Sequence, residues 1–277
     1  MVAGSLASGK EVNFSGSDEV TDWYRYDVTG NSNQKVVTHT FKYNGQVLRN
    51  YSMLYDKTKK AALWVACVMN ADMYPWIVSR GDNWNYDPAL VFGSDYSWQP
   101  NLSSSYVDYT RGHQIASNDR RTTIYQMYQT DYYSNMTPQL SGFNSGMWSS
   151  LEGEIQKIGN ATTGSDILYV VTGPIFGSGY GTAKDKSGTE CAVPTQYFKC
   201  IMKVTYSGGT PVSAMGAAYL MDHVSSGSVR QAVTIHSIEE LTGFDFFANI
   251  PASLQATAEY ETHLTTDFPQ KAIPTSN

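Results

Sequence analysis

The 277-residue sequence has few charged residues and few cysteines. Charged residues make up only 16% of the chain, which excludes long solvated helices, coiled coils and disorder as its main structure. Three cysteines, Cys67, Cys191 and Cys200, are too few for a disulfide framework, and no Cys-x-x-Cys metal motif occurs. Cys67 lies in an apolar run and is predicted to be buried, whereas the sequence leaves open whether Cys191 and Cys200 form a disulfide.

Long apolar runs are absent as well, so we predict no transmembrane helix. The opening residues, MVAGSLASGKEV, lack the apolar core of a signal peptide. We interpret them as a mature or trimmed N-terminus, which leaves a removed export signal open. The net charge of −6 gives no overall attraction to nucleic acid or to anionic membranes. Any anion-binding surface must therefore be a local patch.

Tyrosine and glycine are abundant, with 20 and 23 residues, and this composition favours a β-rich protein with ordered loops. Segments rich in β-branched and aromatic residues are predicted to be strands, because clusters of turn-forming residues separate them. They are residues 35–43, 46–55, 61–70, 166–176, 196–206 and 214–221.

The domain organisation follows from the absence of internal repeats and of composition breaks. We predict one α+β domain, residues 21–265, in which helices flank a central antiparallel sheet. Residues 1–20 are rich in Gly and Ser and are expected to be loose, and residues 266–277 form a Pro-containing tail. The long loop 177–194 is a candidate functional segment.

The clearest predicted helix is residues 142–159, because its apolar residues recur at spacings of three and four. The apolar stripe is Phe143, Met147, Leu151, Ile155 and Ile158. A second stripe on the neighbouring flank is Asn144, Trp148, Glu152 and Gln156. A later helix is predicted from a capping box of Ser237 with Glu240 and a stop at Gly243, and a short one near 251–260.

Two segments contain the residues that point to chemistry. In DYTRGHQIASNDRR, Asp108 to Arg121, His113 follows a glycine. Alone, this pattern is typical of a surface turn. The second segment, SNMTPQLSGFNSGMWSSLE, spans residues 134–152. Together they resemble the two halves of the ββα-metal catalytic motif of the DNA/RNA non-specific endonucleases, and YTRGHQIAS is similar to the Asp-Arg-Gly-His signature of that family.

The resemblance extends from about residue 40 to residue 250. Further segments resemble the family in the same order: NWNYDPAL (83–90), YVVTGPIF (169–176), VPTQYFKCIM (193–202) and IEELTGFDFF (238–247). The resemblance implies a ββα-metal motif embedded in the α+β fold. It also implies hydrolysis of DNA and RNA, single- or double-stranded, to products with 5′-phosphate and 3′-hydroxyl ends.

Matching positions imply the roles of individual residues. His113 resembles the general base, and Asn144 the residue whose side-chain oxygen binds Mg²⁺, for which Mn²⁺ is expected to substitute. Glu152 resembles the acid that hydrogen-bonds the waters of the ion, Asn135 a polar residue that supports the site, and Arg111 the motif arginine. A hard cation that keeps most of its waters needs few protein ligands, so the absence of a His/Cys cluster is consistent with this site.

Three positions depart from the family pattern. Thr110 stands where the family usually has Asp, Gln156 where it has Arg, and Asp82 where an arginine is expected before NWNYDPAL. Arg80 lies two residues before Asp82 and is expected to substitute for that arginine. Arg80, Thr110 and Gln156 are therefore the positions predicted to contact the substrate.

The predicted function is a Mg²⁺-dependent, sugar-non-specific endonuclease that acts on DNA and RNA and is secreted or periplasmic. The oligomeric state stays open, as does whether Arg120 and Arg121 are solvated or face phosphate. The alternative is a catalytically weakened nucleic-acid-binding protein of the same fold, because charge is lost at the three departures. A carbohydrate-binding β protein is suggested only by the Tyr and Trp content, and it does not explain the ordered motifs.

Overall fold

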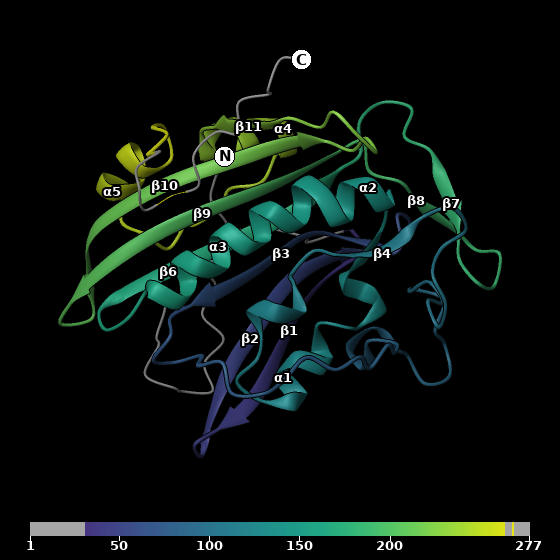
Figure 1. The fold of residues 1–277 in the computed structure, drawn as a ribbon, viewed down its shortest axis with the longest axis horizontal. Helices are drawn as coiled ribbons and strands as arrows, with labels where there is room; N and C mark the ends of the chain where they lie inside the picture. Colours follow the sequence, from purple (N-terminus) through teal and green to yellow (C-terminus); the bar gives the residue numbers. More distant parts are fainter. Residues whose placement is uncertain (1–30, 264–267, 269–277) are drawn as a thin grey trace.

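The computed structural model of this protein describes residues 31–263 and Phe268. Its centre is a twisted sheet of seven strands in which all neighbours are antiparallel (Figure 1). The strands, in their order across the sheet, are β1 (Gln34–Tyr43), β2 (Gln46–Asp56), β3 (Ala61–Met69), β6 (Asp166–Ile175), β9 (Gln196–Ser207), β10 (Thr210–Asp222) and β11 (Arg230–Val233).

Two small hairpin-like sheets and several short helices complete the described part. The small sheets pair β4 (Thr110–His113) with β5 (Met136–Gln139) and β7 (Thr182–Lys184) with β8 (Glu190–Ala192). The helices are α1 (Ile124–Gln129), α2 (Ser141–Phe143), α3 (Ser149–Ala161), α4 (Ile235–Thr242) and α5 (Ala252–Ala258). Single turns are the 3₁₀ helices η2 (Pro88–Leu90), η3 (Ser117–Asp119) and η4 (Tyr133–Asn135), and the π-helical turn η5 (Asn144–Trp148).

Both faces of the large sheet are buried. In β9, Phe198 and Cys200 belong to the cluster that α4 and α5 complete, whereas Tyr197 and Ile201 belong to the cluster that α3 completes. Successive side chains of a strand point to opposite faces, so a strand covered on both sides needs apolar residues at nearly every position. In Figure 1, α3 crosses the near face of the sheet, and α4 and α5 lie behind β10.

The catalytic motif expected from the sequence forms on the face of the sheet that α3 covers. Strands β4 and β5 pair antiparallel, with Thr110 opposite Gln139 and His113 opposite Met136. The chain then enters α2, passes the π-helical turn η5 and continues as α3. This order of two strands and a helix confirms the predicted α+β fold with an embedded ββα motif.

Most predicted elements lie where they were expected, and the predicted helix 142–159 is present. Its interior differs, because η5 interrupts it and Gly146 there has non-helical dihedral angles. The predicted capping box at Ser237 is wrong: α4 begins one turn earlier, and Thr234 accepts a hydrogen bond from the Ser237 backbone N–H (3.0 Å). Gly243 does end α4, in the left-handed conformation at φ 75°.

The three cysteines form no disulfide, and most of the two chain ends lies outside the described residues. Cys67, Cys191 and Cys200 are all buried free thiols, so the open question of a disulfide is answered. The predicted loose segment 1–20 lies outside the described residues, as does the tail 266–277 apart from Phe268, which is buried against the same sheet face as α3. Within residues 31–263, no helix has both the length and the apolar composition of a membrane span.

Candidate active site

A cavity of about 530 Å³ opens beside the ββα motif. The residues that line it come from several segments, among them the loop that precedes η2, β4, η3, α2, the π-helical turn and α3. The predicted site residues among them are Arg80, Thr110, Arg111, His113, Asn144, Glu152 and Gln156. The fold therefore brings together all of the predicted site residues except Asn135.

Gly112 explains how β4 can lie so close to β5. A Cβ atom at this position would overlap the side chain of Gln139, which is fully buried. The glycine between Arg111 and His113 is therefore required by packing, and it lets the two flanking side chains reach the cavity.

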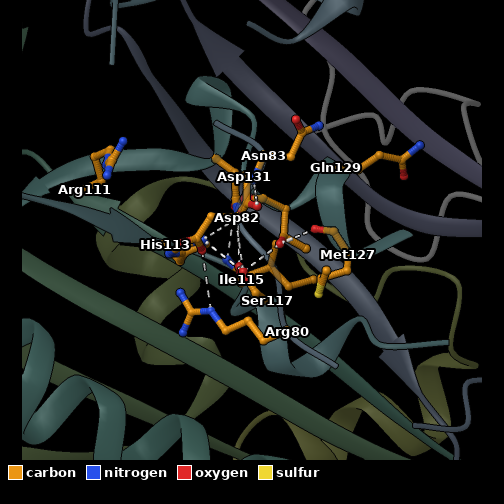
Figure 2. A network of polar contacts seen from close by, with 12 residues as sticks. Arg80, Asp82, Asn83, Arg111, His113, Ile115, Ser117, Met127, Gln129 and Asp131 are labelled. Atoms are coloured by element: carbon orange, nitrogen blue, oxygen red, sulfur yellow. Dashed lines mark hydrogen bonds and ion pairs between the residues drawn. The ribbon is translucent and has the colours of Figure 1, made fainter. Parts of the chain in front are cut away.

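The imidazole of His113 is held by several neighbours. Its Nε2 lies 3.2 Å from Oδ1 of Asp131 and 3.1 Å from the hydroxyl of Ser117. The ring of Trp84 packs on it with centroids 5.3 Å apart, and the indole Nε1 of Trp148 donates to the His113 carbonyl (3.1 Å). Figure 2 shows His113, Ser117 and Asp131 converging.

Thr110 and Asn144 are linked by a hydrogen bond that orients the amide. The Thr110 hydroxyl donates to the Gln139 carbonyl (3.0 Å), so its oxygen accepts from Nδ2 of Asn144 (3.1 Å). A hydroxyl has one proton, and that proton is already used. The NH₂ group of Asn144 must therefore face Thr110, which leaves the amide oxygen for a ligand in the cavity.

Glu152 is a half-buried residue on the cavity wall. Burial raises its pKa to about 8, although the ammonium group of Lys199 lowers it. Its Oε1 is buried and has no hydrogen-bond partner among the described residues. A buried carboxyl oxygen without a partner is costly unless water or an ion satisfies it, so Glu152 fits the waters of a bound cation.

Lys199 lies beneath this wall and supplies a buried positive charge. Its Nζ donates to the Gln114 carbonyl (3.2 Å) and lies 4.2 Å from the centroid of the Trp148 ring. Burial lowers the pKa of Lys199, and the carboxyls of Glu152 and Asp119 raise it. The sequence offered no signal for this residue, because a lysine within a strand is ordinarily placed in solvent.

The motif arginine Arg111 and the predicted substrate-contacting Arg80 differ in how firmly the structure holds them. The guanidinium of Arg111 stacks on Trp84, 3.8 Å from the ring centroid, and donates to the Leu102 carbonyl (3.1 Å). The side chain of Arg80 is about half exposed, at 52%, and its Nε lies 3.9 Å from Asp82. Arg111 is therefore fixed in place, whereas Arg80 can turn toward a ligand in the cavity.

Other polar residues have structural partners. Gln156 lines the cavity but also hydrogen-bonds the buried carboxyl of Asp119. Arg120 is fully buried and donates to the Val68 carbonyl (2.6 Å), so it neither faces solvent nor contacts phosphate. Arg121 donates to the Val78 carbonyl (2.7 Å) and does not line the cavity.

Asn135 does not reach the cavity. It is fully buried, and its side chain donates to the carbonyls of Ile115 (3.0 Å) and Thr130 (2.7 Å) and accepts from the Ile115 N–H (3.1 Å). These bonds tie the segment after His113 to the segment before β5. The geometry therefore favours a supporting role, in which Asn135 holds the backbone that carries His113.

A bound metal has few protein ligands to use. Among the residues that the structure describes, no three His, Cys, Asp or Glu side chains gather as a metal-binding group. Of the oxygen-bearing side chains that line the cavity, the two that the family resemblance matches to the metal site are the amide of Asn144 and the carboxyl of Glu152. Oxygen donors in small number suit a hard cation that retains most of its water.

A family model described as DNA/RNA non-specific endonuclease matches residues 29–253. The chain belongs to this family. It is a nuclease, and the family is one of metal-dependent nucleases.

Relatives and a solved structure agree with this membership. The nuclease of Serratia marcescens is 29% identical over 238 residues, which cover 82% of this chain and 80% of the relative. Human mitochondrial endonuclease G is 27% identical over 219 residues, or 73% of this chain and 69% of the relative. A chain in the crystal structure of the EndoG/EndoGI complex superimposes with a TM-score of 0.56 at 22% identity, covering 82% of this chain and 92% of that one, which shows the fold alone.

Besides Lys199, sequence reasoning missed Trp84 and Asp131 of this nuclease site. Trp84 lies within a segment that matched the family, but nothing in the pattern showed that its ring would contact both Arg111 and His113. Asp131 lies 18 residues after His113, between α1 and η4, where an aspartate is typical of a solvated turn. Only the fold reveals that this carboxylate is buried against the imidazole.

Proposed function

We propose that this nuclease is a Mg²⁺-dependent endonuclease that hydrolyses DNA and RNA, without preference for the sugar, to 5′-phosphate and 3′-hydroxyl products. The observation that supports it most is the meeting of His113 and Asn144, from segments 31 residues apart in sequence, in one cavity with Arg80 and Arg111. A base, an oxygen ligand and cationic groups are the parts that phosphodiester hydrolysis requires.

Asn144 and Glu152 are the residues that would hold the metal. A bound Mg²⁺ would supply Lewis-acid stabilisation of the negative charge that develops on the phosphate and on the departing 3′ oxygen. The hydroxyl of Thr110 orients the Asn144 amide for this role. Glu152 would accept hydrogen bonds from the waters of the ion, and a nearby cation would lower its raised pKa and favour its ionised form.

His113 acts as the general base in this proposal. Its ring lies at the cavity wall and is partly exposed, with 14% of the side chain accessible. A neutral imidazole accepts a proton from water near neutral pH, and the positioned water then attacks the phosphorus. Contacts from Trp84, Ser117 and Asp131 fix the ring and reduce the entropy lost in reaching the reactive arrangement.

Arg111 and Arg80 would contact the phosphate. Contacts to the sugar-phosphate backbone carry little sequence information, which supports activity on both DNA and RNA. We favour an active enzyme over a weakened binding protein. The family pattern has a negative charge at position 110 that Thr110 lacks, but the Asp131 carboxylate lies beside His113. The compartment stays a prediction: we propose a secreted or periplasmic enzyme, and the matched relatives include nucleases named as mitochondrial.

The test uses supercoiled plasmid DNA and a single-stranded RNA, each incubated with the protein and Mg²⁺, Mn²⁺ or a chelator. We expect both substrates to be cut with either metal and neither with the chelator. Products should accept a 5′ label from a kinase only after phosphatase treatment, because their 5′ ends bear phosphate. Undiminished cleavage in chelator would contradict the metal requirement, and intact substrates with both metals from pH 6 to pH 9 would contradict the activity.

A further inference from the structure

We propose that Asp131 is a positioning residue that sets the tautomer of His113. It keeps the imidazole proton on Nε2 and so leaves Nδ1 free to accept a proton from water. This inference rests on the proposed function of His113 as general base. It assigns a role to a residue outside the motif that the sequence resembles.

Three hydrogen bonds fix the orientation of the Asp131 carboxylate. Oδ2 accepts from the backbone N–H of Asn83 (2.8 Å), and Oδ1 accepts from the Ser117 hydroxyl (3.2 Å) and lies 3.2 Å from Nε2 of His113. Asp131 is fully buried, at 0% exposure. Its ion-pair partner is His113.

The chemistry of these groups determines which ring nitrogen bears the proton. An ionised carboxylate can only accept hydrogen bonds. The nitrogen that faces it, Nε2, must therefore be the donor. In a neutral imidazole one nitrogen donates and the other accepts, so a proton on Nε2 makes Nδ1 the acceptor. Among the contacts of the described residues, Nδ1 has no protein partner, and it remains available to water.

The same carboxylate stabilises the product of the proton transfer. After His113 takes a proton, the imidazolium faces a buried negative charge at 3.2 Å. The other charged groups of the cavity are Arg111 on the same strand, Arg80 from the preceding loop and Glu152 from α3, and none of them has a hydrogen bond or ion pair with the ring. Asp131 is therefore the group that balances the charge of the base.

The Asn83 contact makes Asp131→Asn an informative variant. The Asn83 N–H requires an oxygen, so the amide oxygen of the variant should stay on that side. Its NH₂ group would then face Nε2, which would have to accept the hydrogen bond. The ring proton would move to Nδ1, and the nitrogen that faces water would no longer act as a base.

The matched control is the second buried pair of this kind in the chain, His39 and Asp87. Their Nε2 and Oδ2 atoms are 2.9 Å apart, both side chains are buried, and neither lines the cavity. Asp87→Asn makes the same chemical change in a similar environment. It separates a general loss of stability from an effect on His113.

The experiment measures kcat and KM on plasmid DNA with Mg²⁺, and the ¹⁵N shifts of the His113 ring, for wild type, Asp131→Asn and Asp87→Asn. We expect Asp131→Asn to lower kcat by about 10²- to 10⁴-fold, with KM changed by less than about threefold, and to move the ring proton from Nε2 to Nδ1. Asp87→Asn should keep kcat within about threefold of wild type.

A wild-type ring protonated on Nδ1 would overturn the inference, and this measurement does not depend on whether any variant folds. Full activity of folded Asp131→Asn would overturn it as well. Failure of the proposed function would look different, because wild type would then leave the DNA intact or His113→Ala would cleave as fast as wild type. If His113→Ala is inactive and Asp131→Asn is not, only the role of Asp131 is refuted.

Discussion

Thr110 occupies the position where the family pattern has an aspartate, and its hydroxyl has a different task from that of a carboxylate. It accepts a hydrogen bond from the Asn144 amide and donates one to the Gln139 carbonyl. Negative charge reaches the imidazole from Asp131 instead. At the scale of single residues, Thr110 therefore contacts the candidate metal ligand Asn144, and Asp131 contacts the imidazole of His113.

Thr110→Val tests the link between this hydroxyl and the metal. The substitution keeps the shape of the side chain but removes the acceptor that orients Asn144, so we expect about 10- to 100-fold more Mg²⁺ to be needed for half-maximal activity. Thr110→Ser keeps the hydroxyl and should behave like wild type. Mg²⁺ dependence that is unchanged in a folded Thr110→Val protein would refute this role.

The strand pair β4–β5 and the helix after it are the elements that shape the site. Gly112 allows β4 to approach Gln139, and the π-helical turn at Asn144–Trp148 aligns the two candidate metal-binding positions. In a regular α-helix, residues eight apart differ by about 80° in direction. The kink at Gly146, whose dihedral angles are non-helical, breaks this regular phase, and both Asn144 and Glu152 line the cavity.

Gly112→Ala is predicted to damage this element. The added methyl group overlaps the Gln139 side chain, and overpacking of a buried contact costs about 1–3 kcal/mol of unfolding free energy. Thermal unfolding should show the lower stability, and displacement of His113 should lower kcat. Gly181→Ala is the control, because a Cβ atom there meets nothing within 4 Å. Equal stability and activity of both variants would contradict this account of the motif glycine.

Much of the ββα motif could be predicted from the sequence. The remaining features could not, and the reasons are physical. Periodicity located the helix and its buried stripe, since Phe143, Leu151 and Ile155 are buried as expected. It could not show the kink at Gly146, because the apolar stripe continues across it at a regular spacing of four residues. Asp131 was not predictable, since its burial depends on contacts with Asn83 and Ser117, which are distant in sequence.

At the scale of the whole molecule, the large sheet is covered on both faces, and the face opposite the active site also buries acidic groups. Burial raises the pKa of Glu239, on α4, to about 7 and that of Glu259, after α5, to about 9. Glu239 also raises the pKa of Glu259, because the two carboxyls repel each other when ionised. Both groups stay protonated in the folded protein over a pH range in which the unfolded chain ionises them.

Stability should therefore fall as the pH rises. Below pH 4.5, the ordinary pKa of a glutamate, both carboxyls are protonated in the folded and the unfolded state, so no stability is lost. Between pH 4.5 and the raised pKa, about 7 for Glu239 and about 9 for Glu259, the folded state binds more protons than the unfolded state, so stability falls as the pH rises. We expect the melting temperature to decrease from pH 5 to pH 9, and to decrease less in Glu259→Gln. Glu261→Gln is the control, because that side chain is largely exposed. An equal decrease in Glu259→Gln and wild type would contradict this assignment.

The most direct measurement is the single-turnover rate at which His113→Ala cuts supercoiled plasmid DNA at saturating Mg²⁺. His236→Ala serves as the control, because His236 lies on α4, outside the cavity. Loss of a general base predicts a rate about 10²- to 10⁴-fold below wild type for His113→Ala, with binding of DNA retained and His236→Ala unchanged. A His113→Ala protein that cuts within about threefold of the wild-type rate would contradict catalysis by this histidine.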